Sequence, residues 1–288
     1  GPLGPCLANG VFVQKHRELL CLDPFTGDTL WSRSEFPQGC ELFGDEEFLF
    51  VVPPDGKEVL VLDAIDGRDV GKRPIAEGEQ RWATNGRRCL SWTESKDPNG
   101  MRRLRLYDVW SGKTLFEREF AGSARGVTLN DQTLAVMQPD GQLIILSLTD
   151  GQPLVSVPVE PEPGLLSISL HQSEDAYCVI TNRPPPTTPT ADVVAGSALS
   201  QIVTGRVHSF DAKTGKARWQ VGASVEQIGW IVDQPSESPL LVFMRRRTNA
   251  ANQSSLLCLD KRDGRWLFFK DDVPVQANFV EIVARPEQ

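Results

Sequence analysis

The sequence predicts an all-β protein built from six repeated units of four short strands. The segments "LLCLDPFTGDTLW" (19–31) and "RVHSFDAKTGKARW" (206–219) are nearly the same, and weaker copies occur elsewhere in the chain. Apolar runs such as "FLFVV" (48–52) have the length of buried strands and are bounded by turn residues. Helical periodicity is hard to find anywhere. These three observations favour repeated antiparallel sheets.

The repeat is anchored on a glycine. Six hairpin segments align on it: 19–31, 58–71, 103–116, 143–155, 206–219 and 256–268. The anchor residues are Gly27, Gly67, Gly112, Gly151, Gly215 and Gly264, with steps of 40, 45, 39, 64 and 49 residues. The fourth segment has Ser147 four residues before its glycine, where the others carry aspartate: Asp23, Asp63, Asp108, Asp211 and Asp260.

Each aspartate and glycine pair predicts a tight turn between two strands. Glycine supplies the positive φ that such a turn requires, and the aspartate side chain accepts hydrogen bonds from backbone N–H groups inside the turn. The same five aspartates could be imagined as a ring of carboxylates. Their turn context favours hydrogen-bond acceptors at the rim instead.

A large side chain follows the glycine by four residues in four of the segments. These residues are Trp31, Phe116, Trp219 and Phe268. A ring at a regular interval predicts a wedge that packs between neighbouring units and buries much apolar area. Because Gly71 and Val155 occupy this position in the second and fourth segments, we expect weaker contacts there.

Two further candidate strands precede each hairpin, such as "CELFG" (40–44) and "EFLFVV" (47–52) before the second. Four antiparallel strands in about 45 residues form the blade of a β-propeller. Six blades account for nearly the whole chain, so we expect one propeller domain over residues 5–288. We interpret "GPLG" (1–4) as the remnant of a removed purification tag and leave it out of the domain.

Two segments depart from the regular spacing of the repeats. The Pro- and Thr-rich stretch 183–201 contains "RPPPTTPT", and its composition predicts a surface loop inserted in the fifth blade. The segment "QANFVEIVA" (276–284) predicts one further strand. That strand either closes the ring by pairing with the first blade or begins a further unit.

Composition excludes several classes of protein. The formal net charge of −8 opposes attraction to nucleic acid and anionic lipid, and no apolar run is long enough to span a bilayer as a helix. The six cysteines contain no C-x-x-C pair and the three histidines are scattered, so no metal site is predicted. We expect free and mostly buried thiols.

The repeat resembles the quinoprotein-type propeller motif A-x-D-x-x-T-G-x-x-x-W. "FDAKTGKARW" (210–219) matches it almost letter for letter, and "LDPFTGDTLW" (22–31) differs mainly at Pro24. The family includes quinone-dependent alcohol dehydrogenases with eight blades, a bound quinone and a cation. It also includes a non-catalytic branch similar to the lipoprotein that helps to assemble outer-membrane barrels. This chain has six motifs and no adjacent Cys-Cys pair, so the resemblance implies the non-catalytic branch.

No catalytic motif was found, and a fold alone does not imply a chemistry. We therefore predict a non-catalytic scaffold that binds protein partners, without cofactor or metal, as part of a larger bacterial protein. Its expected location is periplasmic, extracytoplasmic or membrane-tethered through the parent protein. The alternative is an enzyme that binds a quinone or a sugar in the central channel. The candidate interface is Trp110, expected as an exposed indole at a turn beside Arg102 and Arg103.

Overall fold

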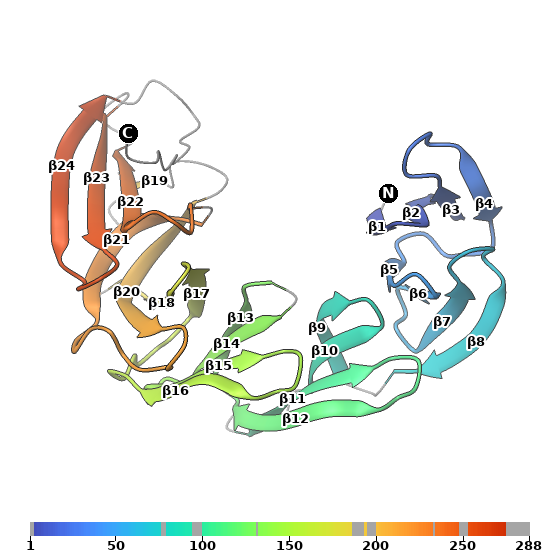
Figure 1. The fold of residues 1–288 in the computed structure, drawn as a ribbon, viewed down its shortest axis with the longest axis horizontal. Helices are drawn as coiled ribbons and strands as arrows, with labels where there is room; N and C mark the ends of the chain where they lie inside the picture. Colours follow the sequence, from blue (N-terminus) through green and yellow to red (C-terminus); the bar gives the residue numbers. More distant parts are fainter. Residues whose placement is uncertain are drawn as a thin grey trace. The chain divides into compact units, whose positions relative to one another are not determined.

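The computed structural model describes residues 3–75, 79–93, 100–130, 132–185, 193–194, 200–232, 234–247 and 253–274. All regular structure in these residues is β, which confirms the predicted fold class, and no helix long and apolar enough to cross a membrane occurs among them. The chain divides into two compact units, residues 1–122 and 123–288. Figure 1 labels the strands of both.

The first unit contains three four-stranded antiparallel sheets, each formed by consecutive strands. The first is β1 (Leu3–Leu7), β2 (Gly10–Lys15), β3 (Glu18–Leu22) and β4 (Thr29–Arg33). The second is β5 (Glu41–Gly44), β6 (Phe48–Val52), β7 (Glu58–Asp63) and β8 (Asp69–Pro74). The third is β9 (Glu79–Asn85), β10 (Arg88–Thr93), β11 (Met101–Asp108) and β12 (Thr114–Ala121).

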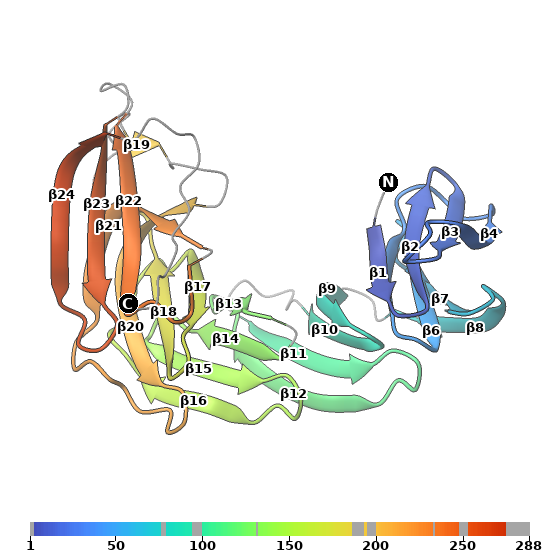
Figure 2. The ribbon, with the colours of Figure 1, turned by 45° about the horizontal axis from the view of Figure 1, so that its top comes forward.

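The second unit contains one more sheet of four strands and a larger one. The small sheet is β13 (Arg125–Thr128), β14 (Thr133–Met137), β15 (Gln142–Ser147) and β16 (Pro153–Pro158). The large sheet contains β17 (Ser167–Gln172), β18 (Ala176–Asn182), β19 (Val193–Val194), β20 (Ser200–Asp211), β21 (Ala223–Ile231), β22 (Leu240–Arg247), β23 (Gln253–Asp260) and β24 (Trp266–Pro274). Figure 2 shows β20 to β24 side by side.

The large sheet differs from the expected pair of separate blades. Strand β20 pairs with β18 through residues 207–211 and with β21 through residues 200–207. It therefore joins the fifth and sixth repeats into one sheet. The predicted second strand of the fifth hairpin, around Trp219, is reduced to an isolated bridge between Phe210 and Ala217. The extended β20 pairs directly with β21 instead of with the missing strand. The number of blades therefore stays a prediction.

Every regular hairpin of the repeat carries a β-bulge at one position. In the first hairpin Leu22 faces Thr29 and Cys21 faces Trp31, so Leu30 has no partner. The same shift occurs between β7 and β8, β11 and β12, β15 and β16, and β23 and β24. A bulge re-aims the side chain that follows it. The residue four positions after the glycine thus has the same place relative to the bulge in these five hairpins.

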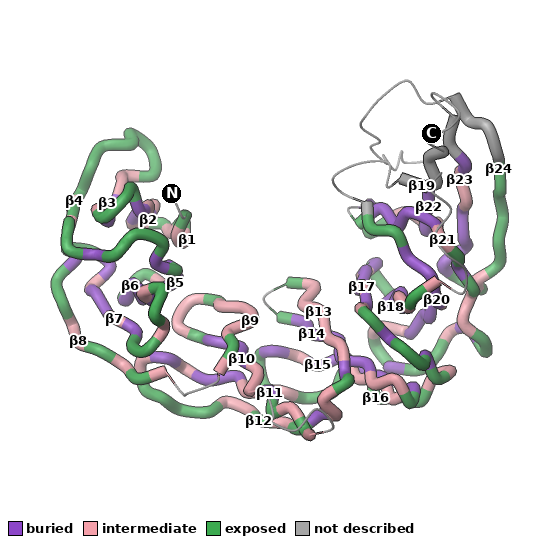
Figure 3. The backbone as a smooth tube through the Cα atoms, turned by 180° about the vertical axis from the view of Figure 1, so that it is seen from behind, coloured by how far each residue is buried: buried purple, intermediate pink, exposed green. Residues whose placement is uncertain are grey.

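The core lies on the second and third strands of each sheet. Every residue of β6 and of β14 is buried, whereas β4, β8 and most of β16 are exposed or half-buried (Figure 3). Consecutive apolar residues on both faces of one strand require a covered sheet. Separate apolar clusters pack on either side of it, for example around Leu49 and around Phe50.

Three expectations about the limits of the domain need comment. Leu3 and Gly4, which belong to the expected tag remnant, begin strand β1, and a Cβ atom at Gly4 would lie 3.0 Å from the Leu42 side chain. The sheet therefore begins before residue 5. Most of the predicted loop 183–201 and all of the predicted strand 276–284 lie outside the described residues.

Candidate functional site

The six repeat turns share one backbone pattern. In the first, the Gly27 N–H donates to the Asp23 carbonyl at 2.9 Å and the Asp23 N–H donates to the Asp28 carbonyl at 2.8 Å. The other five turns make the corresponding bonds, including the one with Ser147. All six anchor glycines have φ between 68° and 75°, a region that other residues adopt at a cost. The turn thus depends on the glycine more than on the aspartate.

The aspartate side chains bind backbone N–H groups of their own turns. Asp211 Oδ1 accepts from Thr214 N at 2.8 Å, and Asp23 Oδ1 accepts from Phe25 N and Thr26 N. Hydrogen bonds from the Thr214 backbone and hydroxyl, and from Arg218, lower the pKa of Asp211 to about 2. These carboxylates therefore have hydrogen-bond partners within their own turns. Among the described residues, no group of three or more His, Cys, Asp or Glu side chains could hold a metal ion.

The tryptophan of one repeat lies on the turn glycine of the next. Trp31 packs against Gly67 and its Nε1 donates to the Ala64 carbonyl at 3.3 Å. Trp219 packs against Gly264 in the same way, and its Nε1 donates to the Lys261 carbonyl at 3.2 Å. These two rings therefore connect consecutive repeats.

In other repeats the space next to the turn glycine is either occupied by backbone atoms or empty. Gly215 faces the backbone of Leu154 and Val155, which is the corresponding strand segment of the fourth repeat. A Cβ atom added at Gly112 would have no neighbour within 4 Å, as expected because Gly71 provides no ring. Phe268 has no following turn among the described residues and is 45% exposed.

Trp110 is placed differently from the exposed indole that we expected. Its ring stacks on Phe48 at 4.7 Å between centroids, and the Arg73 guanidinium lies 3.8 Å from the ring centre. The Arg73 Nε also donates to the Trp110 carbonyl at 2.7 Å. The side chain is half-buried. Its contacts hold the second and third repeats together.

Arg102 and Arg103 do not lie beside Trp110. They pair with Phe120 and Glu119 at the far end of the β11 and β12 hairpin, whereas Trp110 follows Asp108 in the turn. The Arg103 side chain forms an ion pair with Glu117 at 3.3 Å. The structure therefore does not bring the three residues together, and a partner-binding role for any of them stays a prediction.

Strand β24 forms an outer edge of the large sheet, and its first four residues are exposed large apolar side chains. Trp266, Leu267, Phe268 and Phe269 are 40%, 52%, 45% and 60% exposed. Strand β24 pairs with β23 on one side and with no described strand on the other. We call these four residues the β24 edge. The repeat motif singled out Phe268 as a predicted wedge but not the four residues as a group, although four consecutive apolar residues follow the turn in the sequence.

A groove of about 440 Å³ lies among the strands β13, β17, β20 and β21. Its lining includes Ser169, His171, Gln201 and Trp230. His171 Nε2 lies 2.9 Å from Lys261 Nζ, and both side chains are buried. Burial, with a contribution from the Lys261 charge, lowers the pKa of His171 to about 4. The imidazole is therefore neutral at pH 7 and accepts a hydrogen bond from the ammonium.

Lys261 could have been found from the repeat alignment. It directly follows the turn aspartate, a position held by Pro24, Ala64, Val109, Leu148 and Ala212 in the other repeats. Burial also lowers the pKa of Lys261, with nearby anionic groups acting in the opposite direction. A buried lysine at an otherwise apolar repeat position is a departure that sequence comparison within the chain would detect.

A second pocket, of about 240 Å³, lies between the segment at the end of β16 and the C-terminal part of β20. Glu160, His208, Phe210, Trp219 and Gly222 are among its lining residues. His208 and Glu160 approach to 3.6 Å through Nδ1 and Oε2. Sequence reasoning missed this pair because its two members come from separate repeats.

All six cysteines are free thiols, and only Cys6 is exposed. Burial raises the pKa of Cys89 to about 12 and that of Cys178 to about 11. Thiols with such values are protonated at neutral pH and react slowly. These cysteines are therefore packing residues.

Comparison with known proteins gives one family. A family model described as outer membrane protein assembly factor BamB matches residues 3–167 and 79–273. No curated protein sequence matches the chain.

Three solved structures show the degree of likeness. BamB from Moraxella catarrhalis is 14% identical over 91% of this chain and 70% of its own, with a TM-score of 0.43. The computationally designed Ika8 protein is 14% identical over 94% of this chain and 86% of its own, with a TM-score of 0.37. The dihydro-heme d1 dehydrogenase NirN, in complex with DHE, is 14% identical over 94% of this chain and 57% of its own, with a TM-score of 0.44.

Proposed function

The chain belongs to the family of outer membrane protein assembly factor BamB, and from this we propose that it is a non-catalytic scaffold that binds protein partners. The family agrees with the resemblance drawn from the repeat motif, and it supports a role in protein interaction. We further propose that the chain is one domain of a larger bacterial protein. Its proposed place is outside the cytoplasm, on or near the outer membrane, as membership of this family suggests.

The β24 edge is the observation that carries the proposal. Proteins protect open sheet edges with charged residues and prolines, because an unprotected edge pairs with other chains. The other outer strands follow this rule: β4 carries Arg33, β8 carries Lys72 and Arg73, β12 carries Glu117, and β16 begins and ends with proline. Strand β24 has such residues only in its second half, at Lys270, Asp271, Asp272 and Pro274, and its first four residues, Trp266 to Phe269, contain neither device.

The remaining outer strands also expose far less apolar surface. On the strands β4, β8, β12 and β16, Leu30 and Leu154 are the only exposed large apolar side chains among the described residues. Both stand alone, and scattered single residues of this kind need no explanation. Four in a row on one edge strand are typical of a binding surface.

The occupant that fits this edge is an extended segment of a partner protein. An edge strand offers unpaired backbone N–H and C=O groups, which a second strand can satisfy by β-augmentation. Pockets and apolar side chains along the edge then select the sequence of the added strand. We therefore propose a partner segment with apolar residues at alternate positions, paired with β24.

The test uses a library of random twelve-residue peptides displayed on phage and selected against the immobilised full chain. Enriched peptides should carry apolar residues at alternate positions. A synthetic copy of one such peptide should bind the wild-type chain at least tenfold more tightly than Phe269→Lys, which places a charge on the edge. Leu154→Lys, on the outer strand β16, is the matched control and should bind as the wild type does.

The proposal is overturned if no peptide is enriched or if Phe269→Lys binds the selected peptide as well as the wild type does. Because Phe269 is mostly exposed, the free energy of unfolding of the lysine variant should lie within about 0.5 kcal/mol of the wild-type value. Urea unfolding measured by circular dichroism checks this condition. Loss of binding then reports the edge and not the fold.

A second candidate function is the binding of a sugar in the groove lined by Ser169, His171 and Gln201. The hydroxyl group of Ser169 and the amide of Gln201 suit a polyhydroxylated ligand. A panel of mono- and disaccharides, with pyrroloquinoline quinone and Ca²⁺ as a separate arm, should then raise the midpoint of thermal unfolding. Turnover of an alcohol in the quinone arm would favour an enzyme over a scaffold.

A further inference from the structure

The pocket around His208 contains a polar atom without a partner. His208 lies on β20 and is 5% exposed, and its Nε2 has no hydrogen-bond partner among the described residues. A buried polar group left unpaired is costly, commonly by a few-fold to more than a hundredfold in the folding equilibrium, or about 1–3 kcal/mol. Such atoms in native proteins call for an explanation, and a ligand is one of the few available.

The state of His208 follows from its surroundings. Burial lowers the pKa of His208, and the Arg206 charge acts in the same direction, while Glu160 and Glu162 oppose them. The imidazole is therefore mainly neutral at pH 7. Its Nδ1 lies 3.6 Å from Glu160 Oε2, so the ring proton belongs on Nδ1, where it faces a carboxylate. This leaves Nε2 as an acceptor that requires a donor.

Glu160 provides a second acceptor on the same pocket. Burial acts to raise its pKa, but hydrogen bonds from its own backbone and from Gly222 N, together with the Arg206 charge, lower it overall. The carboxylate is thus ionised at pH 7. One oxygen accepts from Gly222 N at 3.1 Å. The other faces the neutral imidazole, so the carboxylate retains capacity to accept a donor.

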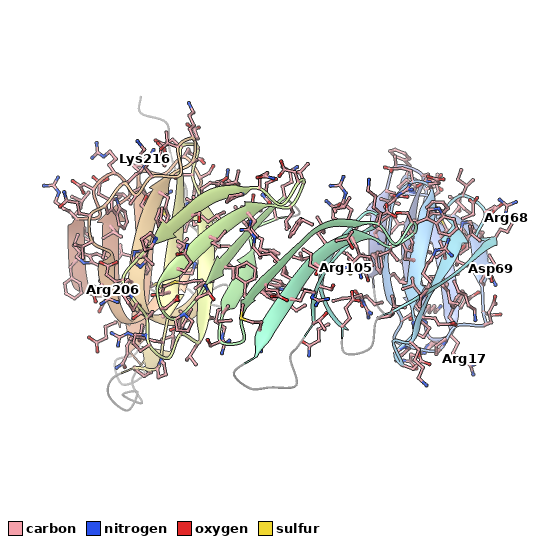
Figure 4. The ribbon with its side chains drawn as sticks, turned by 90° about the horizontal axis from the view of Figure 1, so that it is seen from below. Arg17, Arg68, Asp69, Arg105, Arg206 and Lys216 are labelled. Atoms are coloured by element: carbon pink, nitrogen blue, oxygen red, sulfur yellow. The ribbon has the colours of Figure 1, made fainter. Side chains whose placement is uncertain are left out.

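The nearest arginines are already engaged. Arg206, labelled in Figure 4, lies 3.2 Å from Glu162, and Arg183 lies at the same distance from that carboxylate. Thr181 donates to Glu162 as well, at 2.7 Å. Glu162 is therefore neutralised by its own partners, whereas Glu160 forms no ion pair with an arginine or lysine in the part of the chain that the structure describes. Glu160 therefore has room for a cationic partner, because its side chain is one-third exposed.

Two of the other residues that line the pocket are aromatic. Phe210 and Trp219 both line it, and aromatic faces attract cations, with tryptophan the strongest. The volume of about 240 Å³ is below the range of about 300–1,000 Å³ that holds drug-sized ligands. It suits one side chain or one small amine.

We infer that this pocket binds a primary ammonium group, and that its occupant is a lysine side chain of a partner protein. An ammonium carries three N–H donors and one positive charge. Those donors match Glu160 and the Nε2 of His208, and the methylene stem packs on the aromatic walls. That the occupant belongs to a partner protein rests on the proposed scaffold function, whereas binding of a free amine does not.

The experiment titrates the isotope-labelled full chain with n-butylammonium chloride at pH 7.5. Amide and indole N–H resonances of Gly222 and Trp219 are followed by NMR, with sodium chloride added to a matched reference sample to equalise ionic strength. We expect saturable shifts at these two residues. We expect n-butanol, which has the same carbon chain without the charge, to bind at least tenfold more weakly.

Two variants separate the pocket from the surface charge of the unit. Glu160→Gln should lower the affinity for n-butylammonium at least tenfold, because it removes the anion. Glu174→Gln, which removes an exposed carboxylate outside the pocket, should bind as the wild type does. Equal binding of n-butanol, or unchanged binding by Glu160→Gln, overturns the inference.

The same titration distinguishes the inference from the scaffold proposal. A wild-type chain that binds n-butylammonium but enriches no peptide keeps the ammonium site and contradicts the scaffold proposal. A chain that enriches peptides on the β24 edge but shows no saturable shift with the amine keeps the scaffold proposal and contradicts the ammonium site. The wild-type comparison of amine and alcohol needs no variant, so a folding defect in Glu160→Gln cannot obscure the result.

Discussion

The indole of Trp219 lies directly on Gly264, so closely that a Cβ atom at this glycine would be 2.7 Å from Cδ2 of the ring. Trp31 and Gly67 have the same relationship, again with 2.7 Å between the added Cβ and Cδ2. In each pair the glycine also has a positive φ. The anchor glycine therefore has two roles, since it forms the turn of its own repeat and receives the ring of the preceding one.

Replacing Gly264 by alanine should destabilise the protein more than replacing Gly112. Both residues have nearly the same φ, 74° and 71°, so both variants incur about 1–2 kcal/mol of left-handed backbone strain. Only Gly264 has a ring over it, and overpacking adds about 1–3 kcal/mol. Urea unfolding of Gly264→Ala and Gly112→Ala measures the difference. Equal losses of stability would show that the ring does not press on the glycine.

Truncating Trp219 should destabilise the fold by about 3–5 kcal/mol, as for other core aromatic residues. Trp266→Ala is the matched control, because Trp266 is 40% exposed while Trp219 is 7% exposed. We expect the control to lose less than half as much. The free energy of unfolding in urea is the measurement. A loss below about 1 kcal/mol for Trp219→Ala would contradict the role of its ring as a wedge.

The stability of the protein should fall as the pH falls from about 6.5 to 4, partly because of His171. Its pKa is lowered to about 4 in the folded chain, whereas an unfolded histidine has a pKa of about 6.5. The unfolded state therefore binds more protons in this window. The resulting slope is at most about 1.4 kcal/mol per pH unit for one proton, and it ends below pH 4.

The His171→Gln variant isolates this contribution. Glutamine can still accept a hydrogen bond from Lys261 but does not titrate, so the unfolding free energy should depend less steeply on pH than in the wild type. His16→Asn is the control, since His16 lies in a surface turn with φ of 56° that asparagine tolerates. This variant is measured in parallel to show the effect of losing an exposed imidazole. An unchanged slope in His171→Gln would mean that His171 is not buried beside Lys261.

The fourth repeat allows a test of the turn aspartates. Its Ser147 makes the same backbone turn with a weaker acceptor, at 3.2 Å from Thr149 N. Asp211→Ser should therefore retain the turn and lose the acid-sensitive part of its stability. Because the folded pKa of Asp211 is about 2, this contribution is complete above the unfolded value of about 3.9 and declines toward pH 2. Comparing the acid unfolding curves of Asp211→Ser and the wild type measures it.

The repeat itself could be read from the sequence because its signals are local. A glycine with its aspartate four residues earlier determines a turn within one hairpin. The tryptophan that follows Gly27 or Gly215 packs on the turn glycine of the next repeat. The bulge before Trp31 left no such signal, since any residue can occupy the unpaired position. Register shifts of this type are set by the whole sheet.

The sites were harder to predict because their partners lie far apart in the chain. Glu160 and His208 come from different repeats, and nothing near either residue indicates the other. Trp110 was correctly assigned to a turn, but its stacking on Phe48 and Arg73 depends on how two sheets meet. The joining of the fifth and sixth repeats was missed because a longer β20 replaces a strand that the repeat motif predicts.

Hydrogen–deuterium exchange of the β24 edge in the presence of a selected peptide tests the central claim most directly. If an extended partner segment pairs with β24, backbone N–H groups of residues 266–269 that lack a partner should gain hydrogen bonds. Their exchange should slow when the peptide is added, and Phe269→Lys should abolish the effect. Protection of other strands, with the exchange of residues 266–269 unchanged, would contradict the account.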